Sequence, residues 1–295
     1  MKTTIALFLL LAASPASAVY FDAGLGQSFG HGNYVGTSGF VEVGEDDGIY
    51  AKPSFSTYHS DYIKSTKTYG LRAGYANKHL DIGLEGSVTP KVDGYRSNSL
   101  GADATFSLFP GRGSRRSALK ESSGKSSSGL LRVDLGGGIR QTSHKEDTAA
   151  AVRRGRGTGH EINLNQTDLS AFAGASIFIV DANAELTQSL YSKSSDQMTR
   201  SLQQTAGTGA NPAVFGFPNT SATAKVSVRL MPLLRPFAQY THTTYKLQQP
   251  ASHAYRLGAK TDLMMVQAQG YYEIYDPGAG AKKQAYYGLS AGLKF

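Results

Sequence analysis

Apolar and polar residues alternate with a period of two along most of this chain. Between positions 80 and 88, for example, Leu80, Ile82 and Leu84 alternate with Asp81 and Glu85. Successive side chains of a β-strand point to opposite faces of its sheet, so this pattern predicts a strand with one apolar and one polar face. Patterns of helical period are scarce. The alternating segments number fourteen and begin near positions 19, 35, 49, 69, 80, 100, 131, 169, 182, 222, 234, 255, 264 and 285.

The distribution of charge between the two faces narrows the choice of architecture. The apolar faces of these segments carry no charged residue, whereas the opposite faces carry nearly twenty. A soluble β-sandwich also alternates, but its apolar face must pack against a second sheet. A membrane β-barrel turns the apolar face toward lipid and the polar face toward its lumen. The alternation alone leaves both architectures open.

Composition removes several other classes of protein. The chain has 295 residues with 34 Gly and 17 Tyr, but no Cys and no Trp. Without Cys there is no disulfide, no thiolate nucleophile, no Cys-bound zinc and no iron–sulfur cluster. The 30 Lys and Arg exceed the 22 Asp and Glu by 8, an excess that favours no class of partner. No apolar run approaches the 18 or so residues of a transmembrane helix.

The first eighteen residues have the pattern of a secretory signal peptide. Lys2 supplies the positive charge, a short apolar run spans 5–13, and the small residues Ala16 and Ala18 frame the expected cleavage site. Nine apolar residues are too few to span about 30 Å of hydrocarbon, which argues against a membrane anchor. We therefore expect export and a mature chain of residues 19–295.

The last residues carry the one resemblance to a known class of protein. Positions 287–295 alternate up to a terminal Phe295, and this segment resembles the closing strand of bacterial outer-membrane β-barrel proteins. The resemblance implies an all-β fold, a closed antiparallel transmembrane β-barrel of about 14 strands in the outer membrane of a Gram-negative bacterium. It also implies recognition of the Phe295 strand by the barrel-assembly machinery. Twelve strands remain open, because the run around Tyr255 is short.

An even number of strands places both chain ends on the periplasmic side. Barrels of this class have short periplasmic turns and longer extracellular loops. The long loops are expected at 144–166 and 194–220, and the basic, Ser- and Gly-rich stretch 110–128 is a long connection on the periplasmic side. The short turns are expected near 45–48, 77–78, 180–181, 231–233 and 260–261. The surrounding partners would be outer-membrane lipid and lipopolysaccharide. The basic cluster of Arg153, Arg154 and Arg156 is either a solvated loop or a contact for lipopolysaccharide phosphates.

Residues able to perform chemistry form no convincing constellation. His59, Ser60 and Asp61 are three catalytic residue types, but neighbours in sequence cannot all converge on one substrate atom. Paired His residues at metal-binding spacing are absent, and the Gly-rich stretches open no helix that could hold a phosphate. We therefore expect no enzymatic activity, no catalytic residues, no metal and no cofactor, and no nucleic-acid partner after export.

The polar face supplies the functional hypothesis. We expect a passive, porin-like channel for small hydrophilic solutes, because charged residues on a lumen wall set ion preference. Acidic residues near the middle of one wall would face basic residues across the lumen and create a transverse field. The expected pore-lining residues are Glu85, Asp103, Lys225, Arg229 and Arg256. Aromatic girdles at the membrane surface are expected to include Tyr20, Tyr75, Tyr240, Tyr272 and Tyr287.

Three alternatives stay open at this stage. The lumen could be filled by salt bridges and loops, since fourteen strands lie between barrels that are filled and barrels that leave a channel. The barrel could be structural or bind a partner through its extracellular loops. It could also be an outer-membrane hydrolase with a rim His beside Ser or Asp.

Overall fold

The computed structural model describes most of the chain after the predicted signal peptide. The described residues are 19–45, 47–61, 65–92, 94–109, 131–147, 161–193, 217–229, 234–247, 249–263 and 265–295. The signal peptide itself, residues 1–18, lies outside the described residues. Among the described residues, no helix is long and apolar enough to cross a membrane.

The described chain folds into fourteen β-strands, as the alternation predicts. They are β1 (Val19–Gly30), β2 (Tyr34–Glu45), β3 (Gly48–His59), β4 (Thr66–Ala76), β5 (Leu80–Val92), β6 (Tyr95–Leu108), β7 (Leu131–Asp147), β8 (Glu161–Ile177), β9 (Val180–Tyr191), β10 (Pro218–Val228), β11 (Arg235–Tyr245), β12 (Ser252–Leu263), β13 (Val266–Asp276) and β14 (Gln284–Lys294). The run around Tyr255 belongs to β12, so the count of fourteen is confirmed and twelve is excluded.

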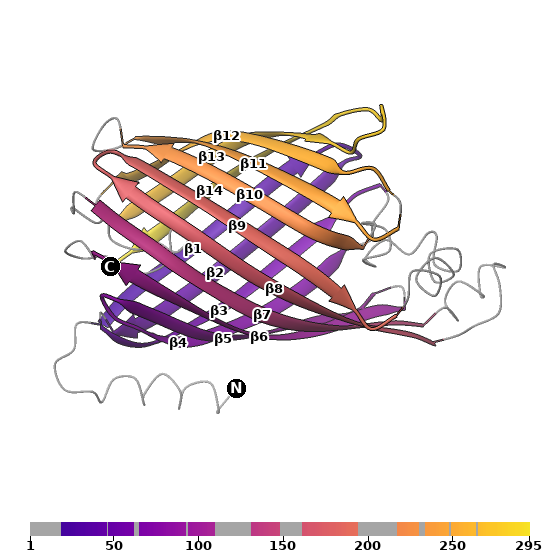
Figure 1. Ribbon diagram of the computed structural model, residues 1–295, viewed down its shortest axis with the longest axis horizontal. Helices are drawn as coiled ribbons and strands as arrows, with labels where there is room; N and C mark the ends of the chain where they lie inside the picture. Colours follow the sequence, from indigo (N-terminus) through magenta and orange to yellow (C-terminus); the bar gives the residue numbers. More distant parts are fainter. Residues whose placement is uncertain are drawn as a thin grey trace.

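Each strand pairs antiparallel with the next, and β1 pairs with β14 to close the barrel (Figure 1). At this closing seam Asp22 lies opposite Lys294. The backbone of Phe295 extends the seam, because its N–H donates to the carbonyl of Phe21 at 2.8 Å and its carbonyl accepts from Phe21 at 3.1 Å. Closure satisfies backbone groups that would each cost several kcal/mol if left unpaired in hydrocarbon.

The two faces of the sheet divide as the alternation requires. Ile82 and Leu84 of β5 are 45% and 63% exposed on the outside of the barrel. Asp81, which directly precedes Ile82, is 7% exposed and points inward. Arg72 of β4 approaches Asp81 from the neighbouring strand. Large apolar side chains are exposed on the outer face of nearly every strand, from Leu25 on β1 to Leu293 on β14. This inverted distribution is that of a transmembrane β-barrel, with the oily surface outside.

The connections after β2, β4, β8, β10 and β12 lie at one end of the barrel, called here the turn end, which also holds the C-terminus (Figure 1). Two further short turns, between β1 and β2 and between β5 and β6, lie at the other end. The opposite end is called the loop end. Two short turns differ from their predicted positions. Residues 180–181 begin β9, and the turn before them is formed by Phe178 and Ile179, with Phe178 at φ 51°. Residues 260–261 lie inside β12, because the alternation continues to Leu263.

The long connections are partly strand. Residues 144–147 extend β7 and 161–166 belong to β8, so these two strands reach seventeen residues each and the predicted loop 144–166 is shorter than expected. Residues 218–220 likewise belong to β10 rather than to the loop 194–220. Residues 148–160, residues 194–216 and the whole stretch 110–128 lie outside the described residues.

Four of the five tyrosines expected in aromatic girdles are exposed on the outer face, namely Tyr75, Tyr240, Tyr272 and Tyr287. The fifth prediction is wrong. Tyr20 points into the barrel and donates a hydrogen bond to Glu42 at 2.6 Å. Its position on the polar face of β1 explains this, because alternation places it on the same side as Asp22.

Candidate functional site

The inner wall of the barrel is the candidate site, and its side chains form rows that run around the lumen from strand to strand. One row, here called the charged row, passes over ten neighbouring strands from β14 through β1 to β9. Its members are Lys294, Asp22, Glu42, Lys52, Arg72, Glu85, Gly101, Arg140, Asp168 and Ser189. Four of these residues are basic and four are acidic, so the row as a whole is neutral.

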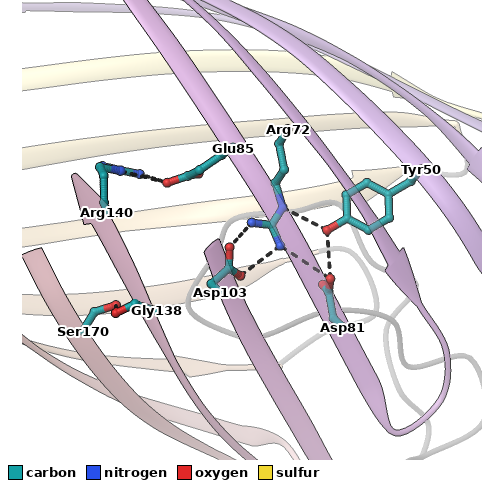
Figure 2. A network of polar contacts seen from close by, with 8 residues as sticks. All are labelled: Tyr50, Arg72, Asp81, Glu85, Asp103, Gly138, Arg140 and Ser170. Atoms are coloured by element: carbon teal, nitrogen blue, oxygen red, sulfur yellow. Dashed lines mark hydrogen bonds and ion pairs between the residues drawn. The ribbon is translucent and has the colours of Figure 1, made fainter. Parts of the chain in front are cut away.

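Arg72 is the centre of a buried cluster in this row (Figure 2). Its guanidinium forms a bidentate pair with Asp103, with Nη2 at 2.9 Å from Oδ2, and its Nε donates to the hydroxyl of Tyr50 at 2.9 Å. That hydroxyl donates in turn to Asp81 at 2.8 Å. The side chains of Arg72, Asp81 and Asp103 are only 13%, 9% and 11% exposed. Every charge in the cluster therefore has a partner of opposite sign on an adjacent or next-adjacent strand.

The ion pair between Arg140 and Glu85, both members of the charged row, is more exposed to solvent than the Arg72 cluster. Arg140 of β7 donates from Nε to Oε1 of Glu85 on β5 at 2.8 Å (Figure 2). The two side chains are 51% and 24% exposed although both point into the barrel. Both side chains are therefore accessible to solvent from inside the barrel.

The opposite part of the wall carries its own charged side chains. Arg256 of β12 donates to Glu273 of β13 at 2.8 Å, and its guanidinium lies 4.3 Å from the ring centre of Tyr271. Arg229 donates to Asp181 at 2.7 Å. The ammonium of Lys225 lies 4.6 Å above the ring of Phe237.

The five residues predicted to line a pore are thus placed on the inner wall, but not in the predicted electrostatic arrangement. Glu85 and Asp103 are each neutralised by an arginine nearby, and Arg256 and Arg229 by carboxylates on neighbouring strands. Charges within about 4 Å interact far more strongly than charges separated by the width of a wet lumen. Local pairs therefore weaken any field across the lumen, and the transverse field itself stays a prediction. The effect of the five residues on permeation stays a prediction.

Several inner charges escaped the sequence analysis because they fell in predicted turns or beyond predicted strand ends. Asp181, the partner of Arg229, was expected in a turn, and so was Lys260. Asp262 binds Arg235 at 3.2 Å and approaches Lys260 at 3.8 Å. Continuing the alternation to the true strand ends would have assigned these side chains to the inner face.

A second inner feature contrasts with the charged row. Two adjacent rows, made mostly of small and polar residues and here called the Ser/Gly rows, cross the closing seam between β14 and β1. They extend from β13 on one side of it to β4 or β5 on the other. The first runs through Gln269, Ser290, Gly26, Ser38, Ser56 and Thr68, and the second through Gln267, Gly292, Gly24, Phe40, Ser54, Gly70 and Ser87. Together with Lys52 and Lys260 they line a cavity of about 460 Å³.

An apolar cluster shapes the loop end of the lumen on the other side. Leu164 of β8 and Phe217, which precedes β10, are 5% and 1% exposed and pack with Tyr191 and Leu247. The rings of Tyr191 and Phe217 meet edge to face at 5.5 Å. Leu164 and Tyr191 share the inward parity of Asp168 and Ser189, so this cluster narrows the mouth over β8–β11.

The residue types considered for catalysis are dispersed. Asp61 accepts hydrogen bonds from the side-chain amide of Asn33 at 2.9 and 3.1 Å, which ties the β1–β2 turn to the end of β3. His242 and His253 lie on the outer face with their Nδ1 atoms 3.4 Å apart. Among the residues that the structure describes, no group of three or more His, Asp or Glu could hold a metal ion.

A closed antiparallel barrel with an apolar exterior and an ionised interior has the fold of bacterial outer-membrane β-barrel proteins, and comparison with solved structures agrees. CdiB from Acinetobacter baumannii superposes with a TM-score of 0.50 at 11% identity over 95% of this chain, which spans 60% of the CdiB chain. Omp33 from the same organism gives 0.46 at 10% identity, covering 95% and 100% of the two chains, and OprB from Pseudomonas putida gives 0.46 at 6%, covering 98% and 96%. No protein-family model and no curated protein matches the chain.

Proposed function

We propose that this barrel is a passive channel in the outer membrane, through which small hydrophilic solutes diffuse down their concentration gradients. The observation that carries the proposal is an ionised inner wall with an exposed ion pair, Arg140 and Glu85, on a closed barrel of fourteen strands. Such transport requires only a wetted path, without a cofactor or a covalent step.

The number of strands supports a lumen wide enough for solutes. Barrel diameter grows roughly linearly with strand number, and the side chains of an eight-stranded barrel just fill its interior. Fourteen strands give a diameter larger by 14/8, or about 1.75-fold. Side chains of similar length then leave an axial space about three quarters as wide as an entire eight-stranded barrel.

The charges on the wall support a hydrophilic path with adjustable ion preference. Paired charges keep the wall polar and wet without creating a strong field of one sign. Where a pair is exposed, each partner can still attract a passing counter-ion. In this proposal Glu85, Asp103, Lys225, Arg229 and Arg256 set the preference between small cations and anions.

The apolar outer face supports a place in the outer membrane, with lipid and lipopolysaccharide as its surroundings. The turn end would face the periplasm, as in barrels with short periplasmic turns. Phe295 completes the seam with β1 and is 60% exposed, so the barrel-assembly machinery could reach it during folding.

Swelling of proteoliposomes tests the proposal. Purified protein, folded and reconstituted into liposomes, should permit uptake of small neutral sugars at rates that fall with increasing solute size. Liposomes that contain the heat-denatured protein should not swell. Absence of size-dependent swelling with the folded barrel would contradict the proposal.

One observation favours a second candidate, a barrel that binds a partner at the loop end. β7 and β8 have seventeen residues each, whereas the other strands have eleven to fourteen, and the apolar cluster of Leu164 and Phe217 supports the base of this hairpin. If the barrel has this function, removing residues 148–160 should abolish partner binding. Liposomes should then fail to swell with either the full-length or the shortened protein.

A further inference from the structure

We propose that the cavity at the Ser/Gly rows is a binding site for a small organic anion that carries several hydroxyl groups. This inference rests on the proposed channel function, of which it would be the solute-recognition site. It is carried by the shape of the cavity, the sign of its charged groups and the kind of hydrogen-bonding groups around it.

The shape is that of a hollow in the wall of the lumen. The cavity of about 460 Å³ spans eight neighbouring strands, β12 to β5 across the seam, where the side chains are small. Gly24 is needed for this shape, since a Cβ there would lie 2.7 Å from the ring of Phe40. The ring can therefore lie against the wall and offer an apolar surface to the carbon chain of a ligand.

The charged groups that line the cavity are both cations. Lys52 and Lys260 contribute to the lining, and none of the described lining residues is acidic. The ammonium of Lys52 lies 3.5 Å from Glu42 and 4.1 Å above the ring of Phe40, but the Glu42 side chain is only 1% exposed. The carboxylate is thus screened from the lumen, whereas the Lys52 side chain is 19% exposed.

Lys260 differs from Lys52 in that its acidic partner is also exposed, with Asp262 at 33%. Its ammonium lies 3.8 Å from Asp262, which does not line the cavity, and its side chain is 30% exposed. Two ammonium groups with their acidic partners outside the cavity attract a carboxylate or phosphate more than they attract a cation. The site should therefore select a solute of negative charge.

The remaining polar groups match hydroxyls on the ligand. Serine and threonine hydroxyls both donate and accept, and a glutamine amide does the same through its two ends. Two of the hydroxyls already bond within the wall, Thr68 to Thr89 at 2.8 Å and Ser87 to Ser99 at 2.7 Å, and each keeps capacity for another bond. The hydroxyls at the cavity belong to Ser38, Ser54, Ser56, Thr68, Ser87 and Ser290.

The position of the cavity favours contact with a passing solute. The apolar cluster at the mouth lies over β8–β11, away from the Ser/Gly rows on β13 to β5. Permeation requires a site that binds firmly enough to attract the solute and weakly enough to release it. Exposed ammonium groups and single hydroxyls meet both conditions.

The test measures gluconate binding by equilibrium dialysis on the folded, detergent-solubilised protein and, separately, ion conductance in potassium chloride. Glucose is the uncharged comparison and acetate is the comparison without hydroxyls. Wild type should bind gluconate more tightly than either. The double substitution Lys52→Gln and Lys260→Gln should weaken gluconate about tenfold or more, the loss expected for a charge-assisted hydrogen bond.

Lys283→Gln is the matched control, because it likewise removes an ammonium group that lies beside a carboxylate, here Asp276 at 3.3 Å, but outside the cavity. It should leave gluconate affinity within about twofold of wild type, since it removes no group of the site. Ser38→Phe should fill the cavity and weaken gluconate with no change of charge. Circular dichroism confirms that each variant is folded.

The outcomes separate this inference from the channel function. If the protein conducts but the double lysine substitution does not weaken gluconate binding, or Lys283→Gln weakens it equally, the anion site is overturned and the channel function is left intact. Equal binding of glucose and gluconate also overturns it. Lysine-dependent gluconate binding without conductance would support the site and overturn the channel.

Discussion

Arg72 illustrates how single residues on the inner wall differ in their contribution to stability. Its side chain is 13% exposed and holds Asp103, Tyr50 and Asp81, whereas Arg140 of the same row is 51% exposed and holds Glu85. Alternation in the sequence places all of these side chains on the inner face. Their pairing could not be predicted, because it depends on how neighbouring strands are aligned, and alignment is not encoded in any one strand.

The substitution Arg72→Gln should destabilise the barrel by about 3 kcal/mol, because it leaves buried carboxylates without their cation. Arg140→Gln, its matched control, should cost less than about 1 kcal/mol, because water can solvate Glu85. Urea unfolding in lipid vesicles, followed by circular dichroism, measures both. If the two variants lost the same free energy of unfolding, burial would not explain how much each ion pair contributes to stability.

Exposed pairs should instead determine ion preference. Glu85→Gln removes the carboxylate beside Arg140 and should shift the permeability ratio toward anions, by about twofold to fivefold, since a unit charge nearby in water contributes up to about 1 kcal/mol. Arg256→Gln leaves Glu273 without its partner and should shift the ratio toward cations. Reversal potentials in a potassium chloride gradient measure both shifts. Shifts of the same sign, or none, would contradict a conducting path along this wall.

Strands were predictable because the period of two is a local property of the sequence. Turns were less so, and the two misplaced turns show why. Phe178 forms a turn at φ 51°, and the connection after Leu263 contains no Gly, Pro or Asn, so neither has the usual turn composition. The seam between β1 and β14 joins the two ends of the described chain, and only the resemblance of the last residues to a closing strand pointed to it.

The seam depends on close approach of the two terminal strands at Gly292. A Cβ at this position would lie 2.6 Å from the carbonyl oxygen of Ala23 on β1. Gly292→Ala should therefore destabilise the barrel by about 1–3 kcal/mol through overpacking against backbone that cannot yield. Unfolding in urea again provides the measurement.

Gly86→Ala serves as the control for this prediction, because the nearest atom to a Cβ there is 3.6 Å away, an ordinary contact. This variant should have stability within about 1 kcal/mol of wild type. Similar losses in both variants would mean that glycine matters for strand flexibility in general and not for the approach of the strands at the seam.

The whole molecule is a cylinder whose outside is apolar and whose inside is ionised, and this property was predictable from the sequence. Width and content of the lumen were not, because they depend on strand alignment and on connections between strands. The Ser/Gly rows also escaped prediction, since Gly26, Ser38 and Ser56 come from three strands and become neighbours only through the alignment of those strands.

Single-channel conductance in a planar lipid bilayer tests the open lumen most directly. Purified, folded protein in potassium chloride should produce discrete current steps whose size rises in proportion to the applied voltage, and heat-denatured protein should produce none. If the folded barrel inserts, as shown by protease-protected protein in the bilayer, and still passes no current, then the lumen is filled and the channel account is contradicted.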